Sequence, residues 1–422
     1  MTGDSLPPGW TALQISDVLS PLSDGRILHH GWSPQCDSEP AGPGEWGALK
    51  TTAIQPLSFL PDHNKHLPPT LKPRPHLAVA AGDILITCAG PRARCGIACL
   101  VRKEAPLRFI SGKMYRFRPR TDLVDPRYLE AYLQAPTTQH LINRMKTGIS
   151  DSGLNLTHER FLKLPVPIAP LPEQSRIVEA IESNLARLDA ASTSLLQAQS
   201  LLTRYEEALR EFHLSGFNAR DWKKATLGSL LRERLRNGLT TRTDGRDTGV
   251  RTLTLTAVTT GDFGLHNTKP SAIPRGLAEG MWLEHGDLLI ERSNTKELVG
   301  TCALYEGPRD YAVFPDMVIR ARVVPEVSTR FVLHSLQSRA ARMYFQRMAK
   351  GVAGNMPKID QPTISAVPLV LPPRSEQDRI ASELDAAIAG ARRWRREVEH
   401  ALSSLEGLRR AILRAAFEGR LS

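Results

Sequence analysis

Two long stretches of this chain carry apolar residues at alternating spacings of four and three, and each begins just after a Pro-rich turn. About five heptads on such a repeat indicate a left-handed coiled coil, and ~36 residues rising ~1.5 Å each give a rod of ~54 Å. Neither helix can bury its stripe alone, so we expect an antiparallel pair. The stripe positions are Ile177, Ile181, Asn184, Leu188, Ala191, Leu195, Ala198, Leu202, Tyr205, Leu209 and Phe212, then Ile380, Leu384, Ala387, Ala391, Trp394, Val398, Ala401, Leu405, Leu408, Ile412 and Ala415.

The seam of this predicted coiled coil contains several alanines and one polar residue. The alanines permit close approach of the helices, and Asn184 is a candidate for fixing their register. Paired helices would hold the segments that they join at opposite ends of a ruler. The alternative is that each stripe packs only on its own globular segment.

The two halves of the chain repeat each other. Residues 49–213 align with residues 253–416, and the alignment brings Gly82-Asp83-Ile84 onto Gly286-Asp287-Leu288. The repeat is far too long for a solenoid unit, so we interpret it as two complete domains of one design with pseudo-twofold symmetry. The predicted organisation is a first domain at 1–169, a first helical spacer at 170–217, a second domain at 218–373 and a second helical spacer at 374–422.

Within each globular half, short apolar runs predict strands and longer periodic runs predict helices. The expected fold class is therefore α+β, with two similar mixed domains joined by two long helices. Residues 20–76 are rich in Pro and Gly and are expected to be irregular loop, or ordered only in a complex. The expected strands are Leu253 to Val258, Asp287 to Ile290, Thr301 to Tyr305 and Met317 to Val324, and the expected helices are Tyr128 to Met145 and Phe331 to Met348.

Composition places the chain among ordinary soluble proteins. A length of 422 residues accommodates roughly two to three domains of ~100 to 200 residues. No stretch approaches the ~18 apolar residues that a membrane span needs, and the N-terminal residues do not resemble a leader, so we expect a cytoplasmic protein that does not enter a membrane. Five cysteines, an odd and sparse set, argue against a disulfide framework.

The net charge of +11 is unevenly distributed. Residues 1–169 hold 19 Lys and Arg against 14 Asp and Glu, and residues 218–373 hold 22 against 15. By contrast, residues 170–217 hold 4 against 7, and residues 374–422 hold 10 against 8. Two basic globular segments beside an acidic connector suit two modules that each touch a polyanion, whereas charge for solubility is the alternative.

The sequence argues against catalysis by this chain alone. An adenine methyltransferase needs a Gly-rich cofactor loop and an Asn-Pro-Pro-aromatic tetrapeptide, and neither string occurs. A metal-dependent nuclease needs clustered carboxylates to activate water and neutralise charge. Pro61-Asp62 and Pro315-Asp316 have no Glu-x-Lys downstream, so a nuclease site is not expected either.

The histidines and cysteines are not expected to bind metal. His29-His30 and His63 to His66 lie in Pro-rich surroundings without a second cluster of usable spacing, so we interpret them as solvated loop histidines. Cys88, Cys95 and Cys99 lie in a strand-like run, which indicates buried thiols. No cofactor is therefore predicted for this chain.

Two loops recur at matching positions in the halves and carry short polar and cationic side chains. One follows each Gly-Asp strand, and the other follows the helices that end at Met145 and Met348. Arg and Lys suit guanine, Asn and Gln suit adenine, and glycine allows a close approach to phosphate, although any single residue could instead be a solvated loop side chain. The candidate DNA-binding residues are Arg92, Arg94, Lys146, Thr147, Gly148, Ser150, Arg292, Ser293, Asn294, Lys296, Lys350, Gly351, Asn355 and Lys358.

Several strings of this sequence are specific in combination. They are LPVPIAPLPEQSRIVEAIESNLARLDAA with its partner VPLVLPPRSEQDRIASELDAAI, the strings AGDILI and HGDLLI, and the closing AILRAAFEGRLS. Together they resemble the specificity subunit of type I restriction-modification enzymes along nearly the whole chain. The Pro-rich residues 20–76 depart from that pattern.

The resemblance implies a subunit without a cofactor or catalytic activity of its own. It would read double-stranded DNA at two half-sequences separated by an unspecified spacer, and dock two methyltransferase (M) subunits that carry S-adenosylmethionine and methylate adenine. Motor-nuclease (R) subunits would complete the restriction complex. A ~54 Å rod corresponds to roughly one and a half turns of B-DNA, so spacer length should follow helix length. The alternatives are a recognition adaptor of a related methylase-nuclease system and a coiled-coil scaffold that binds no DNA.

Overall fold

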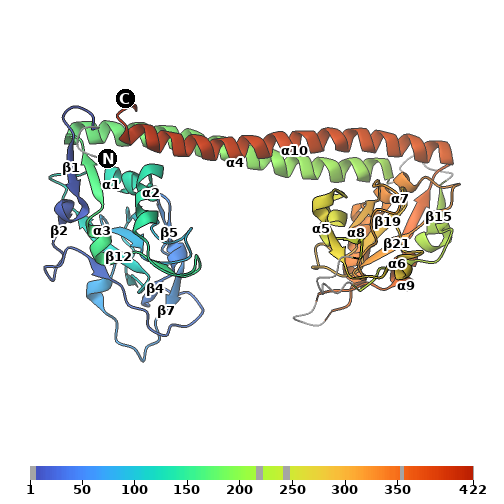
Figure 1. Cartoon of the computed structure of the whole chain (residues 1–422), viewed down its shortest axis with the longest axis horizontal. Coiled ribbons are helices and arrows are strands. Elements are labelled where there is room, and N and C mark those ends of the chain that lie inside the picture. The colour runs from blue at the N-terminus through green and yellow to red at the C-terminus, as the bar shows by residue number, and fades with distance from the viewer. Residues whose placement is uncertain (1–5, 215–221, 241–247, 352–355, 422) are drawn as a thin grey trace. The chain divides into compact units, whose positions relative to one another are not determined.

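The computed structural model describes residues 6–214, 222–240, 248–351 and 356–421. The chain divides into two compact units, which we call unit 1 (residues 1–195 and 400–422) and unit 2 (residues 196–399). Two helices of 44 residues each, α4 (Leu171–Leu214) and α10 (Arg374–Phe417), contribute to both units (Figure 1). Within the described ranges, no helix is both long enough and apolar enough to span a membrane.

Unit 1 is built around an antiparallel sheet with strand order β10-β8-β12-β2, and β3 also pairs with β12. A parallel pair, β4 with β11, belongs to a smaller sheet beside it, and β1 pairs with β14. The strands are β1 (Thr11–Gln14), β2 (Leu19–Ser20), β3 (His29–His30), β4 (Gly47–Leu49), β5 (Ile54–Gln55), β6 (Ser58–Phe59), β7 (Asn64–His66), β8 (Ile84–Thr87), β9 (Ala89–Gly90), β10 (Ala98–Leu100), β11 (Arg108–Phe109), β12 (Met114–Pro119), β13 (Leu154–Asn155) and β14 (Pro165–Ile168). The short helices are η2 (Ile15–Val18), η3 (Thr51–Ala53), η4 (Pro75–Leu77), α1 (Pro126–Gln134), α2 (Pro136–Met145) and α3 (His158–Leu162).

Unit 2 repeats this plan with the strand order β16-β21-β19-β20, in which β19 takes the place of β8. The pair β15 and β22 corresponds to β1 and β14. The strands are β15 (Lys223–Thr226), β16 (Arg236–Asn237), β17 (Val250–Leu253), β18 (Thr268–Ser271), β19 (Leu288–Glu291), β20 (Cys302–Leu304), β21 (Val318–Ala321) and β22 (Pro368–Leu371). The helices are η5 (Leu227–Leu230), α5 (Leu255–Thr260), η6 (Leu265–Asn267), α6 (Arg275–Ala278), α7 (Thr329–Leu336), α8 (Arg339–Met348) and α9 (Gln361–Ser365).

The repeated Gly-Asp strings place one buried carboxylate at the start of each central strand. Arg118 donates to the Asp83 carboxylate from Nε and Nη2 at 3.0 and 2.8 Å, and Arg322 donates from Nε to Asp287 Oδ1 at 2.6 Å. Both carboxylates are almost completely buried. A buried carboxylate needs such a charged partner, so each pair ties the central strand to the strand beside it.

A buried glutamine fixes the beginning of each long helix. Gln174 Oε1 accepts from the backbone N–H of Asp125 at 2.8 Å, and Gln377 Oε1 accepts from that of Ser328 at 2.9 Å. The side-chain amides donate to backbone carbonyls just before each helix, at 2.7 and 2.8 Å. The glutamine of each Glu-Gln pair in the sequence, Gln174 or Gln377, therefore attaches its long helix to the globular part.

The long helices pair in antiparallel orientation inside each unit. In unit 1, Asp189 of α4 forms an ion pair with Arg409 of α10. In unit 2, Glu206 contacts Arg395 at 3.0 Å and His213 contacts Glu383 at 3.6 Å. Residue numbers rise along α4 while those of its contacts fall along α10 in unit 2, which confirms the predicted direction.

Each long helix also packs on a globular core. The two alternatives considered for the apolar stripes, pairing of the helices and packing on a globular segment, therefore both occur. Ile177, Val178, Ile181 and Leu185 of α4 belong to the main core of unit 1. Four residues of α10 form a cluster with Phe331 of α7 in unit 2, namely Ile380, Ala381, Leu384 and Ile388. Asn184 does not act across the seam as expected, because its amide donates to the Ala180 carbonyl of its own helix at 2.8 Å.

Three secondary-structure predictions need correction. The run from Leu253 to Val258 is not one strand, because β17 ends at Leu253 and α5 begins at Leu255, with Thr254 capping the helix through the backbone N–H of Ala257. A short apolar run does not separate strand from helix, whereas the cap does.

Both predicted helices of the globular halves are in fact pairs of helices. The one from Tyr128 to Met145 is divided because α2 starts anew at Pro136 after an extended Ala135. The one from Phe331 to Met348 is divided into α7 and α8, because an extended Ser338 caps α8 through the backbone N–H of Ala341.

The expectation of an irregular loop at residues 20–76 is wrong in part. Much of the segment is irregular, but it contains β3 to β7, and Leu49, Ala53, Ile54 and Leu67 are buried in a second core beneath the smaller sheet. Its strands have only two or three residues, too few for a period of two to be visible in the sequence. The remaining strand predictions, near β19, β20 and β21, are confirmed within a few residues.

One histidine was also interpreted wrongly. His29 is 2% exposed, and its ring nitrogens lie 2.9 Å from Asp24 Oδ1 and 3.0 Å from Arg116 Nη2, so it is a buried structural residue. Cys88, Cys95 and Cys99 are buried free thiols as predicted, and burial raises the pKa of Cys88 to about 12. Among the described residues, no group of three or more His, Cys, Asp or Glu side chains is arranged to hold a metal ion.

The buried Asp–Arg pairs predict a large loss of stability on truncation. Replacing Asp287 by Ala removes the hydrogen-bonded carboxylate of Arg322, whose side chain is 13% exposed. Arg322 then keeps the longer contacts with Glu284 at 3.5 Å and Glu233 at 3.6 Å. We expect the free energy of unfolding to fall by at most ~3–5 kcal/mol, the cost when a buried ion pair loses one partner, because these two carboxylates remain nearby. Urea denaturation followed by circular dichroism measures this, with Glu326→Ala at an exposed position as the control. Equal stability of the two variants would contradict the role given to Asp287.

Candidate nucleic-acid interface

Two loops meet beside the central sheet of unit 1. The strand loop, residues 88–97, joins β8 to β10, and the helix loop, residues 146–155, follows α2. β9 of the strand loop pairs with β13 of the helix loop, and the backbone N–H of Arg92 donates to the Asp151 carbonyl at 2.8 Å. The two loops therefore form one surface.

Cationic side chains join the two loops of unit 1. Arg92 donates from Nε and Nη2 to Asp151 Oδ1 at 3.1 and 2.8 Å, and this contact lowers the pKa of Asp151 and raises the pKa of Arg92. Lys146 Nζ donates to the Arg92 carbonyl at 3.0 Å, and partial burial lowers the pKa of Lys146. Arg92 remains exposed at the surface, whereas Lys146 is partly buried.

Arg94 points toward the protein rather than toward solvent. It donates to the carbonyls of Thr51 and Ile54 and to Gln55 Oε1, the last two at 2.8 and 3.2 Å. These contacts fasten the strand loop to the smaller sheet region. Arg94 thus suits positioning of the loop better than direct contact with a ligand.

The helix loop of unit 1 requires glycine at its turn. Gly148 has φ 141°, and a Cβ atom there would lie 2.7 Å from the Gly153 carbonyl oxygen. Thr147 and Asn155 close the loop through two backbone hydrogen bonds of 2.8 Å. Ser150 is exposed at the tip, and its hydroxyl lies 2.9 Å from that of Ser152.

Unit 2 builds the same pair of loops, here residues 292–301 and 349–358. Lys350 and Lys358 exchange two backbone hydrogen bonds of 2.9 Å, which correspond to the bonds between Thr147 and Asn155 in unit 1. Ser293 forms an antiparallel bridge with Lys358, and the Ile359 N–H donates to the Arg292 carbonyl at 2.8 Å. The structure therefore brings the predicted loops together in both units.

The side chains of the second pair of loops are held differently. Asn294 Nδ2 donates to Glu291 Oε2 at 2.6 Å, and Thr259 Oγ1 donates to Glu291 Oε1 at 2.6 Å. Glu291 is fully buried, and burial raises its pKa. Asn294 Oδ1 accepts from the Thr295 N–H at 2.8 Å, so both polar atoms of the amide are engaged within the loop.

Exposure separates the predicted site residues into three groups. Asn355 lies outside the described residues, and Ser293 is buried, at 4% exposed. Partly buried side chains are those of Arg94, Lys146, Thr147, Arg292 and Asn294. Exposed residues are Arg92, Gly148, Ser150, Lys296, Lys350, Gly351 and Lys358.

Sequence reasoning missed the acidic residues that organise these loops. Asp151 and Glu291 each hold a predicted site residue, but a search for cations and amides passes over carboxylates. Glu291 could have been noticed, because it ends the apolar strand in the place that Thr87 takes in unit 1. Ile149 was also missed, and it is fully exposed beside Gly148.

A close packing contact fixes each strand loop against a helix. A Cβ atom on Gly96 would lie 2.6 Å from Ile142 of α2, and one on Gly300 would lie 2.6 Å from Phe345 of α8. Both glycines also have positive φ, at 90° and 78°. Only glycine meets both requirements without strain.

The chain is similar to a known family of proteins. Residues 73–197 match the family model described as the type I restriction modification DNA specificity domain. The chain is similar to the type I restriction enzyme EcoEI specificity subunit of Escherichia coli, at 34% identity over 212 residues, which covers 50% of this chain and 34% of that protein. It is also similar to the EcoKI specificity subunit of Escherichia coli strain K12, at 27% identity over 300 residues, covering 68% of this chain and 64% of the relative.

These comparisons confirm the resemblance seen in the sequence. The chain spans about a third of the length of the first relative and just under two thirds of the second.

Two solved structures share the fold. One, described as the structural basis underlying complex assembly and conformational transition of the type I R-M system, has a TM-score of 0.73 at 18% identity and 99% coverage of both chains. The other, the HsdS subunit from Thermoanaerobacter tengcongensis, has a TM-score of 0.52 at 18% identity, with 99% of this chain and 98% of that chain covered. The predicted α+β class of mixed domains with long helices is thus confirmed.

The contact between Gly300 and Phe345 predicts a loss of stability in unit 2. Gly300→Ala adds a Cβ atom that α8 cannot accommodate without moving, at a backbone angle that alanine disfavours. We expect the free energy of unfolding to fall by ~1–3 kcal/mol. The control is Gly276→Ala, at an exposed position where a Cβ atom meets nothing within 4 Å. Thermal unfolding of both variants measures this difference. If Gly300→Ala were as stable as the control, the close packing of Gly300 on Phe345 would not limit the stability of unit 2.

Proposed function

We propose that this chain is the DNA-reading specificity subunit of a type I restriction-modification complex. Unit 1 and unit 2 each read one half of a bipartite, interrupted site in double-stranded DNA. The chain supplies recognition, while two methyltransferase (M) subunits bring S-adenosylmethionine and methylate adenine, and motor-nuclease (R) subunits act through the complex. The protein works in the cytoplasm, where its DNA lies.

The observation that carries this proposal is the duplicated pair of loops. The backbone bonds that join strand loop to helix loop recur in both units, for example Thr147 with Asn155 and Lys350 with Lys358. The side chains on that common scaffold differ, with an exposed Arg92 in one unit and an exposed Lys296 in the other. Equal scaffolds with unequal surfaces suit two different half-sites, so an asymmetric site is expected.

The exposed and engaged side chains suit different roles at DNA. Lys296, Lys350 and Lys358 are exposed cations that can neutralise phosphates, which positions a protein without specifying sequence. Asn294 suits adenine, and it must exchange its bond with Glu291 for base contacts. The fully exposed Ile149 can contact a thymine methyl group.

The long helices set the distance between half-sites in this proposal. Each helix has 44 residues and is therefore ~66 Å long at ~1.5 Å per residue. The proposal keeps the domain organisation expected from the sequence. The two recognition domains are residues 1–169 and 218–373, and the two helical spacers are residues 170–217 and 374–422. A recognition adaptor of a related methylase-nuclease system would use the same features with a different partner.

Base-resolved adenine methylation tests the proposed function directly. The methyltransferase subunit encoded beside this chain is expressed with and without it, and cellular DNA is sequenced for methyladenine. One interrupted, two-part motif that occurs only when the chain is present is the expected result. Methylation that ignores the chain, despite an active partner, would favour a scaffold that binds no DNA.

Two substitutions separate phosphate contact from base reading. Lys350→Ala should weaken binding to all sequences alike and reduce the slope of log Kd against log salt by ~1, because a phosphate contact is lost. Asn294→Ala should relax one position of one half-site, at a cost of ~1–3 kcal/mol on the preferred base.

Fluorescence anisotropy with a set of single-base variants of the site measures both effects. Lys223→Ala, at an exposed position on β15 outside the loops, is the control. Unchanged binding of Asn294→Ala to every base variant would remove Asn294 from the base-reading residues.

Removing one heptad from each long helix should shorten the DNA spacer. Deleting residues 192–198 together with residues 400–406 takes ~10.5 Å from both helices, or about three base pairs of B-DNA, and keeps the heptad register. The methylated motif should keep both half-sites and lose about three spacer bases. Deleting residues 192–198 alone is the control, because it leaves the two helices unequal. An unchanged spacer in an active double deletion would show that the helices do not set it.

A further inference from the structure

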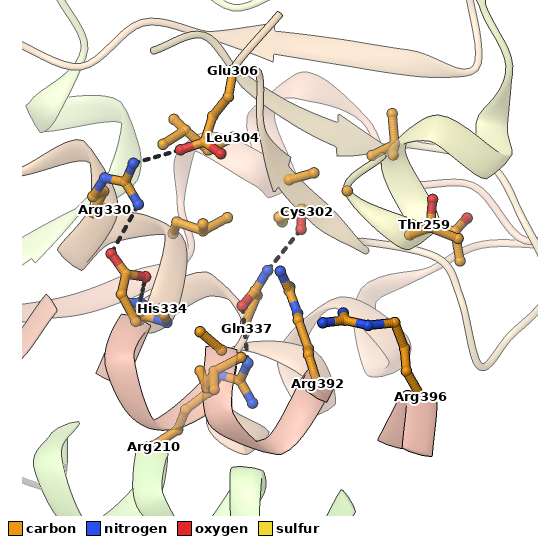
Figure 2. A pocket seen from close by; sticks show the side chains of 18 residues that line it. Arg210, Thr259, Cys302, Leu304, Glu306, Arg330, His334, Gln337, Arg392 and Arg396 are labelled. Atoms are coloured by element: carbon orange, nitrogen blue, oxygen red, sulfur yellow. Dashed lines mark hydrogen bonds and ion pairs between the residues drawn. The ribbon is translucent and has the colours of Figure 1, made fainter. Parts of the chain in front are cut away.

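Unit 2 contains a pocket of about 400 Å³ that the recognition loops do not explain. Its walls come from the ends of α4 and α5, from β20, from α7 and from residues 385–396 of α10 (Figure 2). Apolar side chains, including Val258, Leu304 and Ile388, line part of it. The volume falls in the range of ~300–1,000 Å³ that is typical of small-molecule sites.

Four arginines line this pocket, and among the residues that the structure describes only Arg330 of these four forms an ion pair. Arg330 donates to Glu306 Oε1 at 2.5 Å and to Asp385 Oδ2 at 2.9 Å. Arg210 has neutral acceptors instead, Gln337 Oε1 at 3.2 Å and the Glu206 carbonyl at 3.4 Å.

The other two arginines, Arg392 and Arg396, belong to α10. Within the residues that the structure describes, no carboxylate lies in ion-pair contact with Arg392 or Arg396, and Figure 2 shows both guanidinium groups directed toward the pocket from α10. Arg392 also repels Arg210: burial and this positive neighbour lower the pKa of Arg210. The Glu206 and Glu207 carboxylates act on Arg210 in the opposite sense, but without ion-pair contact. The pocket therefore gathers three guanidinium groups that form no ion pair within the described part of the chain.

Unit 1 offers an internal comparison at the matching place in the repeat. Its pocket of about 360 Å³ also contains arginines, but each has a carboxylate. Arg102 contacts Glu130 at 2.6 Å, and Arg409 pairs with Asp189. Asp189 occupies the repeat position of Arg392, so unit 1 has an acid where unit 2 adds a cation.

The remaining arginine of the unit 1 pocket is likewise paired. Arg127 contacts Asp125 at 2.8 Å and Glu182 at 3.4 Å. The pocket shape is thus common to the repeat, whereas the excess positive charge is confined to unit 2. A general feature of the fold does not account for that charge.

We propose that the pocket of unit 2 binds a phosphate-bearing anion through Arg210, Arg392 and Arg396. Forked guanidinium donors match the oxygens of a phosphate group, and charge-assisted hydrogen bonds of this kind are strong when they are partly shielded from water. Arg210 is partly buried while Arg392 and Arg396 are exposed, and like charges held together at such a site are unfavourable until an anion joins them. The inference stands on the pocket alone and does not require that the loops read DNA.

The test measures binding of three phosphate probes to the full chain by isothermal titration calorimetry at low salt. The probes are inorganic pyrophosphate, ATP and a short DNA duplex. Arg392→Asp places in unit 2 the residue that unit 1 has, and Arg393→Ala is the matched control, since Arg393 is exposed on the same helix outside the pocket lining. Arg396→Gln, at an exposed position, serves as a second variant should Arg392→Asp fail to fold.

Saturable binding of pyrophosphate or ATP that Arg392→Asp and Arg396→Gln weaken ~10-fold or more, and that Arg393→Ala leaves unchanged, is the expected result. If the duplex displaces pyrophosphate from the wild-type chain, the phosphate comes from the DNA backbone; if it does not, the ligand is a small phosphorylated molecule. Failure of all three probes to bind saturably would overturn the proposal. Equal weakening by Arg392→Asp and Arg393→Ala would overturn it too, because the effect would then be one of overall charge. Pyrophosphate binding can fail while the methylation motif persists, so the two proposals are tested separately.

Discussion

Burial of an apolar stripe along each 44-residue helix constrains everything else in this protein. The first turns of α4 and α10 are buried in globular cores through Ile177 and Ile380, and further along each helix lies against the other. Gln174 and Gln377 fix the two starting points by hydrogen bonds to the chain that leads into them. The direction in which each globular part is attached to its helix therefore depends on a few buried contacts.

The repeat preserves the contacts that build the scaffold and leaves the loop surface free to differ. Buried polar groups recur in both units because an unpaired one would be costly: Asp83 and Asp287 with their arginines, and Gln134 and Gln337, which donate to carbonyls of β10 and β20 at 2.9 Å. Exposed side chains at the ends of the loops can bond to water and need no protein partner. A duplicated scaffold can in this way support two different surfaces.

The pockets of unit 1 and unit 2, beside the long helices, likewise share a scaffold but differ in the charges that line them. The framework that seats α4 on unit 1 and α10 on unit 2 leaves a hollow at the same place in each repeat. In unit 1, Asp189 neutralises Arg409, and in unit 2 its counterpart Arg392 adds to the positive charge. A difference of this kind is invisible in the fold and depends on which residue of one helix faces which residue of the other.

The sequence by itself determined the repeat, the two long helices, the α+β class and the position of the strand and helix loops, because heptads and matched strings are local or periodic signals. It could not show that residues 20–76 form short strands over a second core, since two-residue strands leave no period. It did not show that Arg94 and Asn294 are held by Thr51 and Glu291, or that Asn184 bonds to its own helix. Those outcomes depend on contacts between residues distant in the sequence or on competing partners, and only the tertiary structure decides which donor reaches which acceptor.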